Sequence, residues 1–347
     1  MSHMSEDEGH AVPVRRRRAR QRNIFLVFLG IFVVAAIVSV AFLGNLAVSF
    51  DNKTQTIPSA FPNETLRPTK ATEGPAAGAV NILLLGSDSR GAAVDLAEEG
   101  AASDQRSDTM MWAHIPSDRK HIYLMSIMRD TWVDIPGYGQ AKINAAMAFG
   151  GVPLVVETLE GMFKSRIDHV AIVDFEGFKT ITDALGGVTV DVPVSFSSSH
   201  GDYTFTTGPQ KLNGDQALAF VRERYAFIDG DYQRVRNQQI FLKSLLAAVL
   251  TPSTLTNPLK VTELVDQVAP YISVDVGLDA KAVGALALSL KSVRGSDVVS
   301  FTLPTLGTGT SADGQSIVLL DQAAVSAIAQ ALSDDTLGDH IAQAGLG

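Results

Sequence analysis

Apolar residues recur along this chain in two patterns, one with the spacing of strands and one with the spacing of helices. Three short runs between residues 80 and 127 consist mostly of aliphatic and β-branched residues. Such runs are typical of buried strands. We therefore predict strands at Val80–Leu85, Met110–Ile115 and His121–Ile127.

Helical patterns then alternate with further strand-like runs. Val152–Phe163 has Pro153 in a first-turn position and its apolar residues on one face. Asn213 and Asp321 are candidate N-caps of two later helices. The further predicted elements are strands at Ile167–Asp174, Val188–Val192 and Asp297–Leu303, and helices at Arg234–Leu250 and Gln322–Ala331. Interleaving of this kind predicts an α/β (mixed α+β) fold with a central β-sheet sandwiched between helices.

The N-terminal part of the chain predicts a membrane anchor. Residues 24–43 carry no charged side chain, and at ~1.5 Å per residue they span roughly 30 Å of hydrocarbon. Six arginines between Arg15 and Arg22 precede this span, so the positive-inside rule keeps the N-terminus in the cytoplasm. The alternative is a cleaved signal peptide, but its apolar region is normally ~7 to 15 residues long, and no clear Ala-x-Ala site follows. We expect a single-pass protein of the cell membrane with a large extracellular domain.

Composition sets the other boundaries. Residues 1–22 are predicted to form a cytoplasmic basic tail, followed by a transmembrane anchor at 23–48. Residues 49–78 are rich in Thr, Pro, Ser, Ala and Gly with little periodic apolar content, which predicts an extracellular linker. We predict one continuous globular domain at 79–335 and a frayed C-terminal tail at 336–347.

Charge and cysteine content argue against several classes of protein. The net charge is −9, and the first 22 residues contain six arginines against three acidic residues, so the remainder carries −12. An acidic exported domain argues against a nucleic-acid-binding surface. The chain has no cysteine, so its core and not disulfides must stabilise that domain. The seven histidines are scattered without ligand spacing, which argues against zinc.

Charged residues gather just beyond the end of the first predicted strand. Asp88 follows that strand closely, and Arg106 and Asp108 come shortly after. Carboxylate oxygens suit a hard divalent cation, and guanidinium groups match phosphate oxygens. These residue types together favour a site that holds a divalent cation and a pyrophosphate.

A second concentration of charge begins at Arg222, where four arginines fall within fifteen residues. If the chain is extended here, Arg222 and Arg224 point to one side and Glu223 to the other, which gives two parallel guanidinium groups for one anion. In the helix that follows, Asp231 and Arg234 share a face. The alternative is a solvated network of surface ion pairs, and spacing alone does not decide between the two.

Arg129 and Asp130 stand at the end of the third predicted strand, where α/β folds place ligands. With this motif the chain resembles the LytR-CpsA-Psr family, membrane-anchored cell-wall enzymes of mainly Gram-positive bacteria. The resemblance is strong over about residues 80–250 and extends to about residue 335. The motifs that carry it are, in order, Asn81–Asp88, Arg106–Met110, Arg129–Thr131, Lys142–Asn144 with Ala148–Gly151, Leu212–Leu218, and the arginine run with Gln238 and Gln239 behind it.

The resemblance implies a phosphotransferase. Such an enzyme takes a glycopolymer from its polyprenyl-pyrophosphate carrier, attaches it to peptidoglycan through a phosphodiester, and releases polyprenyl phosphate. An exported domain beside the membrane meets the lipid carrier at high effective concentration. Teichoic acid, capsular polysaccharide and arabinogalactan all present the same diphosphate, so the polymer stays open. Two alternatives also stay open: a polyprenyl-diphosphate pyrophosphohydrolase, and a non-catalytic envelope scaffold or regulator.

By motif match, the resemblance also implies roles for individual residues. Asp88 and Asp108 would hold Mg²⁺, with Mn²⁺ as the alternative, on the diphosphate. The catalytic residues would be Arg129, Arg106 and Asp231, with Asp231 taking the acceptor's proton. Nearby arginines make a carboxylate a weaker base, which is the main objection to Asp231, and Asp130 is the alternative. The pyrophosphate-binding residues would be Arg106, Arg129, Arg222, Arg224, Arg234 and Gln238.

The family's lipid cavity has no recognisable lining in the sequence. An isoprenoid chain needs a long apolar cavity, which family members place between sheet and helices. We interpret the candidate aromatic residues as ordinary core, and these are Phe149, Phe163, Phe175, Phe178 and Phe220.

Overall fold

The computed structural model describes residues 42–87, 109–251 and 257–346. The chain divides into two units, Met1–Val48 and Ser49–Gly347. In the first unit, residues 42–48 are helical, and the rest of the predicted anchor lies outside the described residues. The second unit contains the fold and the candidate site that follow.

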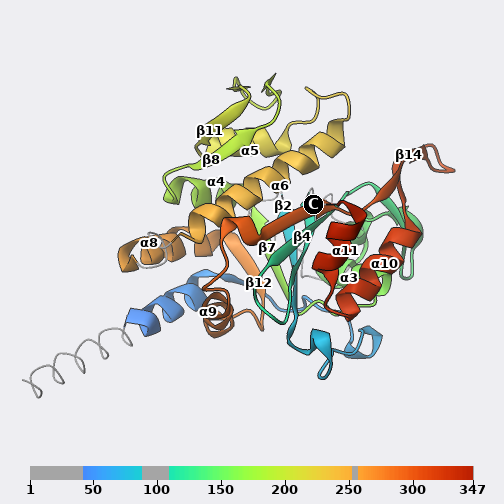
Figure 1. Ribbon diagram of the computed structural model, residues 1–347, viewed down its shortest axis with the longest axis horizontal. Coiled ribbons are helices and arrows are strands. Elements are labelled where there is room, and N and C mark those ends of the chain that lie inside the picture. The colour runs from blue at the N-terminus through green and yellow to red at the C-terminus, as the bar shows by residue number, and fades with distance from the viewer. Residues whose placement is uncertain (1–41, 88–108, 252–256, 347) are drawn as a thin grey trace, which may run out of the picture. The chain divides into compact units, whose positions relative to one another are not determined.

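A seven-stranded mixed sheet forms the centre of the second unit, in the order β1-β12-β7-β2-β3-β4-β13 (Figure 1). Its strands are β1 (Gln55–Ile57), β2 (Val80–Ser87), β3 (Thr109–Ile115), β4 (Ile122–Ile127), β7 (His169–Asp174), β12 (Ile272–Asp275) and β13 (Val298–Thr302). Strand β2 runs antiparallel to β3 and parallel to β7, while β4 runs antiparallel to β3 and parallel to β13. The predicted strands of this sheet are confirmed, with ends shifted by two residues at most.

Helices cover both faces of this sheet, which explains why β2 is apolar along most of its length. Leu83 and Leu85 pack in a core that includes residues of α3 (Ala145–Phe163), α10 (Gln322–Ser333) and α11 (Leu337–Ala344). Ile82 and Leu84 belong to the opposite core, with residues of α6 (Gly230–Val249) and α9 (Ala280–Ser289). Figure 1 shows α3, α10 and α11 grouped together, apart from α6. The predicted mixed fold, with its sheet between helices, is therefore confirmed.

Helix α3 has a kink at its two glycines. Gly150 and Gly151 are non-helical, with φ of −152° and 63°, so Pro153 lies in the first turn after the kink, as predicted for a helix starting at Val152. Of the described helices, α3 is the one long and apolar enough to cross a membrane. However, 56% of its most apolar stretch is buried inside the domain, as expected of a core helix.

A further layer contains α4 (Phe175–Ala184), α5 (Gly214–Arg222) and two small antiparallel sheets. The sheets pair β8 (Val188–Val192) with β11 (Gly208–Leu212), and β9 (Phe196–Ser197) with β10 (Thr204–Phe205). Phe205, Phe220 and Phe241 belong to the apolar core of this layer. The predicted N-cap Asn213 is confirmed, since it forms a capping box with Gln216 at the start of α5. This cap fixes where α5 begins.

The remaining elements include a second, four-stranded sheet in the order β14-β15-β5-β6. Its strands are β5 (Thr131–Ile135), β6 (Gly139–Lys142), β14 (Thr305–Thr310) and β15 (Ser316–Leu320). Strand β5 follows β4 after a short turn, so this sheet begins where the central sheet ends. The other described elements are helix α8 (Pro258–Val268), the helical residues 49–53, and four 3-10 turns at Glu64–Leu66, Pro75–Gly78, Ala269–Tyr271 and Gly295–Asp297.

The predicted linker at 49–78 is corrected by the structure. Strand β1 lies in this segment and pairs with β12, and Ile57 is wholly buried in the main core. Farther along, the buried side chain of Arg67 donates to Glu160 at 2.7 Å and stacks over the Phe61 ring at 4.2 Å. A three-residue strand and single side-chain contacts produce no periodic apolar pattern. The composition of this segment therefore indicated a linker although the segment is folded.

The predicted C-terminal tail at 336–347 is likewise wrong. Most of it forms α11, which buries Leu337 and Ile341 in the main core. Asp335, just before it, accepts hydrogen bonds from the Ser117 backbone and side chain at 3.0 and 2.5 Å. The two buried residues of α11 are one turn apart, which is too short a pattern to distinguish from a frayed end.

Candidate active site

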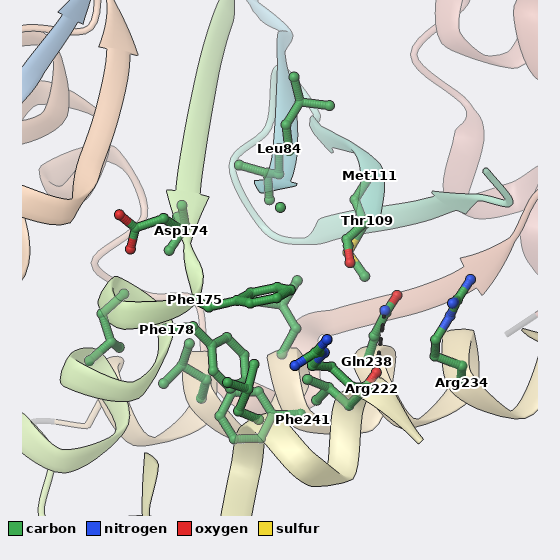
Figure 2. A pocket seen from close by; sticks show the side chains of 18 of the residues that line it. Leu84, Thr109, Met111, Asp174, Phe175, Phe178, Arg222, Arg234, Gln238 and Phe241 are labelled. Carbon is green, nitrogen blue, oxygen red and sulfur yellow. Dashed lines mark hydrogen bonds between the residues drawn. The ribbon is translucent and has the colours of Figure 1, made fainter. Parts of the chain in front are cut away.

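An apolar cavity of about 410 Å³ lies between the central sheet and helices α4, α5 and α6. Leu84 and Met111 line it from the sheet, while Leu218 and Leu245 line it from the helices. Figure 2 shows Phe175, Phe178 and Phe241 gathered on one side and Arg222, Gln238 and Arg234 on the other. The cavity therefore combines an apolar body with a cationic end.

The phenylalanines interpreted as core have three different locations. Phe163 and Phe220 are wholly buried core residues, as expected. Phe175 and Phe178 line the cavity instead, although nothing in their sequence spacing distinguishes them. Phe149 is 38% exposed and stacks on Tyr138 at a ring distance of 4.6 Å. The packing of α4 against the sheet decides which of these phenylalanines line the cavity.

The described residues that were predicted to bind pyrophosphate all line this one cavity, and they are Arg129, Arg222, Arg224, Arg234 and Gln238. They come from the turn after β4, the end of α5, the turn that follows α5, and the first turns of α6. Predicted residues from distant parts of the chain are thus brought together. Arg106, Asp88 and Asp108 lie outside the described residues.

The turn after β4 fixes the backbone of Arg129. Thr131 closes the turn by donating its hydroxyl to the Met128 carbonyl at 2.6 Å. The Asn144 amide donates to the Arg129 carbonyl at 3.1 Å. Both carbonyls are thereby held, so the Arg129 side chain starts from a rigid position at the end of the sheet. Next to it, Asp130 forms an ion pair with Lys142 at 3.1 Å.

Asp231, in the first turn of α6, lies at the centre of three arginines. Its carboxylate is 3.4 Å from Arg234 Nη2, 3.7 Å from Arg224 Nη1 and 3.9 Å from Arg129 Nε. The predicted sharing of a face by Asp231 and Arg234 is confirmed. All three separations exceed normal hydrogen-bond length, so these contacts are ion pairs with room to rearrange. A carboxylate at this place also suits the positive end of the helix.

Glu223 holds the backbone of the turn that follows α5. Its carboxylate is wholly buried and accepts hydrogen bonds from the backbone amides of Arg224 and Ala226 and from Ser198 and Ser199. Burial alone would raise the pKa of Glu223, but the hydrogen bonds, led by that from the Ser199 amide, outweigh it and lower the pKa to about 2. Glu223 thus joins the turn after α5 to the segment between β9 and β10.

The expected alternation of this segment holds, but for a different reason. The expectation assumed that the chain is extended here, whereas α5 continues through Arg222 and the chain leaves the helix at Glu223. Arg222 and Arg224 still reach the cavity, with Glu223 buried between them in sequence. The sequence indicated no anchoring role for Glu223, because its serine partners lie over twenty residues earlier.

Aromatic rings orient two of the arginines. The Arg222 guanidinium lies 4.7 Å from the centre of the Phe175 ring. Arg224 lies 4.6 Å from the Tyr225 ring and donates to its hydroxyl at 2.5 Å. Stacking of this kind fixes the orientation of the guanidinium plane and leaves its positive charge available to a ligand.

Buried amide side chains fix α6 against its neighbours. Gln239 donates to Ser126 of β4 and Thr302 of β13, both at 3.0 Å. Asn237 donates to the Phe220 carbonyl of α5 at 3.2 Å. Arg236, the fourth arginine of the run, does not line the cavity and pairs with Asp229 instead. One face of α6 therefore lines the cavity, and only part of the arginine run belongs to the candidate site.

The predicted metal ligands lie in sequence between the end of β2 and the start of β3, and these two strand ends lie beside the cavity. Gly86 of β2 and Thr109 of β3 are directly paired, and both line the cavity. Asp174 also lines it, but its carboxylate caps α4 by accepting from the Gly177 amide at 2.7 Å. Within the described ranges, no group of three or more His, Cys, Asp or Glu could hold a metal ion.

Comparisons with known proteins agree on one family. The LytR_cpsA_psr family profile matches residues 46–334. The polyisoprenyl-teichoic acid–peptidoglycan teichoic acid transferase TagU of Enterococcus faecalis is 32% identical over 255 residues, covering 73% of this chain and 78% of that protein.

Two solved structures share the fold. The crystal structure of B. subtilis TagV has a TM-score of 0.63 at 24% identity, covering 74% of this chain and 97% of that one. The structure of TagT bound to LI-WTA has a TM-score of 0.60 at 25% identity, covering 82% of this chain and 100% of that one.

Proposed function

Because this chain belongs to the LytR-CpsA-Psr family, we propose that it transfers a glycopolymer from a polyprenyl-pyrophosphate carrier to a peptidoglycan hydroxyl. The product is a phosphodiester, and polyprenyl phosphate is released. The observation that carries this proposal is the cavity with an apolar body and four arginines among its lining residues. An isoprenoid chain suits the apolar body, and a diphosphate suits the guanidinium groups.

The transfer depends on positioning and on charge neutralisation. An oxygen–phosphorus bond forms from the acceptor hydroxyl, and the bridging bond of the diphosphate breaks, with its electron pair leaving on polyprenyl phosphate. Arg129, Arg222, Arg224 and Arg234 stabilise the charge that develops on the phosphate oxygens.

Asp231 is the proposed base for the acceptor's proton, in spite of its cationic surroundings. Its ion pairs of 3.4–3.9 Å are longer than hydrogen bonds, so phosphate oxygens can draw the arginines away and leave the carboxylate free to accept the proton. Asp130 is the alternative base, but its ion pair with Lys142 at 3.1 Å is closer and competes more strongly for the carboxylate.

We propose that Mg²⁺, or alternatively Mn²⁺, is held by Asp88 and Asp108 at this site. Two carboxylates form a suitable donor set for a hard cation that keeps most of its water. Support comes from connectivity, since each aspartate is the neighbour in sequence of a described strand end, Ser87 or Thr109. When bound, the ion would neutralise diphosphate oxygens.

We also propose a cell-membrane location, with residues 1–22 in the cytoplasm, 23–48 as the anchor and the catalytic domain extracellular. The uncharged span and its arginine-rich flank support this topology. Since the segment at 49–78 packs into the fold, the catalytic domain begins close to the anchor. A short connection of this kind supports the proposal, because a membrane-tethered enzyme meets its carrier lipid at high effective concentration.

The test uses the full-length chain in detergent with Mg²⁺, a labelled polyprenyl-diphosphate sugar and peptidoglycan. We expect release of polyprenyl phosphate and label in peptidoglycan. Arg129→Ala and Asp108→Ala should each abolish both, with an unchanged circular dichroism spectrum. Arg236→Ala is the matched control and should keep activity, because Arg236 does not line the cavity.

Each other outcome has its own meaning. Release of polyprenyl phosphate without label in peptidoglycan would indicate a pyrophosphohydrolase, and neither signal would indicate a scaffold. Full activity of both variants would contradict the site itself.

A further inference from the structure

A second hollow, of about 580 Å³, adjoins the apolar cavity. The two share Arg129, Arg224 and Tyr225 in their linings. The hollow also has its own lining residues, which include Asp130, Lys142, Asn144, Asp231 and Ser316. The shared arginines therefore stand between an apolar compartment and a polar one.

We propose that this hollow binds the acceptor of the transfer, as an uncharged saccharide ring whose hydroxyl attacks phosphorus. The inference rests on the proposed function and adds to it the place and chemical class of the second substrate. Asp231 lines the hollow and is absent from the cavity lining, so the proposed base faces the compartment from which the hydroxyl comes.

The geometry of phosphoryl transfer requires two compartments of this kind. The attacking and leaving oxygens lie roughly in line through phosphorus. If the isoprenoid chain occupies the cavity, the leaving oxygen points into it, and the attack must come from the opposite side of the shared arginines. The donor's own sugar is attached to another oxygen of the transferred phosphorus. That oxygen does not lie on the line between the attacking and leaving oxygens, so the sugar projects away from both compartments.

The balance of charge favours an uncharged ligand in the hollow. Four arginines and one aspartate line the cavity, whereas the hollow has three cations against Asp130 and Asp231. Lys142 and Arg129 are both within 4 Å of Asp130, so much of the cationic charge is already balanced. A mixture of donors and acceptors of this kind suits sugar hydroxyl and amide groups better than a phosphate.

Tyr225 adds an apolar surface at the boundary. Its side chain is 70% exposed while it lines both compartments. An exposed aromatic face next to hydrogen-bonding groups can pack against the C–H face of a pyranose ring. Ser316 closes the hollow from the start of β15, which is held by the Val318 amide donating to the Asp130 carbonyl at 2.9 Å.

The test fills the hollow without touching the cavity. Ser316→Tyr adds a bulky side chain at an exposed strand position that lines only the hollow. Ser326→Tyr, on the exposed face of α10, is the matched control. Because it blocks binding of the acceptor alone, Ser316→Tyr should raise the KM for a soluble glycan fragment of peptidoglycan by about tenfold or more. The affinity for sugar-free polyprenyl diphosphate should stay within about twofold, and the control should match the unaltered chain.

Lys142→Ala provides a second variant should Ser316→Tyr unfold. It should also raise the acceptor KM, with unchanged affinity for sugar-free polyprenyl diphosphate. An unchanged acceptor KM in the folded variants would overturn the inference and leave the proposed function intact. Weaker binding of a sugar-bearing donor, with unchanged binding of the sugar-free carrier, would also overturn it, since the hollow would then hold the donor's sugar. No transfer by the unaltered chain would instead refute the proposed function.

Discussion

Glu223→Gln tests whether a buried anion anchors the arginine-bearing turn. One carboxylate oxygen accepts from the amides of Arg224 and Ala226 at 2.9 and 3.0 Å, and the other accepts from Ser198 and Ser199. Glutamine has nearly the same shape, but its NH2 group cannot accept, so two or more of these donors lose their partner. The change therefore removes the charge and half of the acceptors without making a cavity.

The pKa of Glu223 gives the size of the effect. Its value falls from an ordinary 4.5 to about 2 on folding. A difference of about 2.5 in pKa corresponds to roughly 3 kcal/mol in the free energy of unfolding. Because the pKa is depressed, this stabilisation is fully present above pH 4.5 and is lost as the pH falls towards 2. At about pH 3.5, linkage leaves roughly 2 kcal/mol of it.

The assay is urea unfolding of the full chain in detergent, followed by tryptophan fluorescence, because Trp112 and Trp132 both lie in the described domain. The variant should be less stable by roughly 3 kcal/mol at pH 7, and the difference should shrink by about 1 kcal/mol at pH 3.5. Glu73→Gln, at an exposed position, should stay within about 0.5 kcal/mol at both values. Equal stability of wild type and Glu223→Gln at pH 7, or a difference independent of pH, would refute the reasoning.

Three further predictions concern the domain boundary, the cavity and the metal. Ile57→Ala should lower the free energy of unfolding by about 2–5 kcal/mol, as measured by urea unfolding, because Ile57 is wholly buried in the main core. Leu218→Trp should narrow the cavity and weaken binding of a long polyprenyl diphosphate by about tenfold, as measured by calorimetry, while a short-chain analogue binds as before. Chelation should abolish release of polyprenyl phosphate, and added Mg²⁺ should restore it; activity that persists in chelator would contradict the roles of Asp88 and Asp108.

Elements with a local signal were predictable from the sequence. The apolar runs of β2, β3 and β4 and the caps Asn213 and Asp321 are decided by neighbouring residues, and the structure has them within two residues of the predicted positions. Strand β1 was missed because three residues carry no period, and its pairing with β12 joins positions more than two hundred residues apart. Tertiary contacts decide such elements, so a local pattern cannot indicate them.

The candidate site divides in the same way. The arginines could be identified because their residue type and motif order are unusual in an acidic domain. The groups that position the arginines could not be identified from the sequence. Glu223 is held by serines from a distant hairpin, and Arg222 stacks on the ring of Phe175. The polar hollow was also hidden, because Lys142 and Ser316 meet only after β5, β6 and β15 pair in the second sheet.

The central claim is that the arginine-lined end of the cavity binds a lipid-borne diphosphate. A crystal structure of the catalytic domain, produced within the full chain and bound to a polyprenyl-diphosphate sugar, tests this claim most directly. We predict phosphate oxygens within hydrogen-bonding distance of the Arg129 and Arg224 guanidinium groups, with the isoprenoid chain between Phe178 and Leu84. Diphosphate density elsewhere on the domain, with the cavity unfilled, would contradict the account.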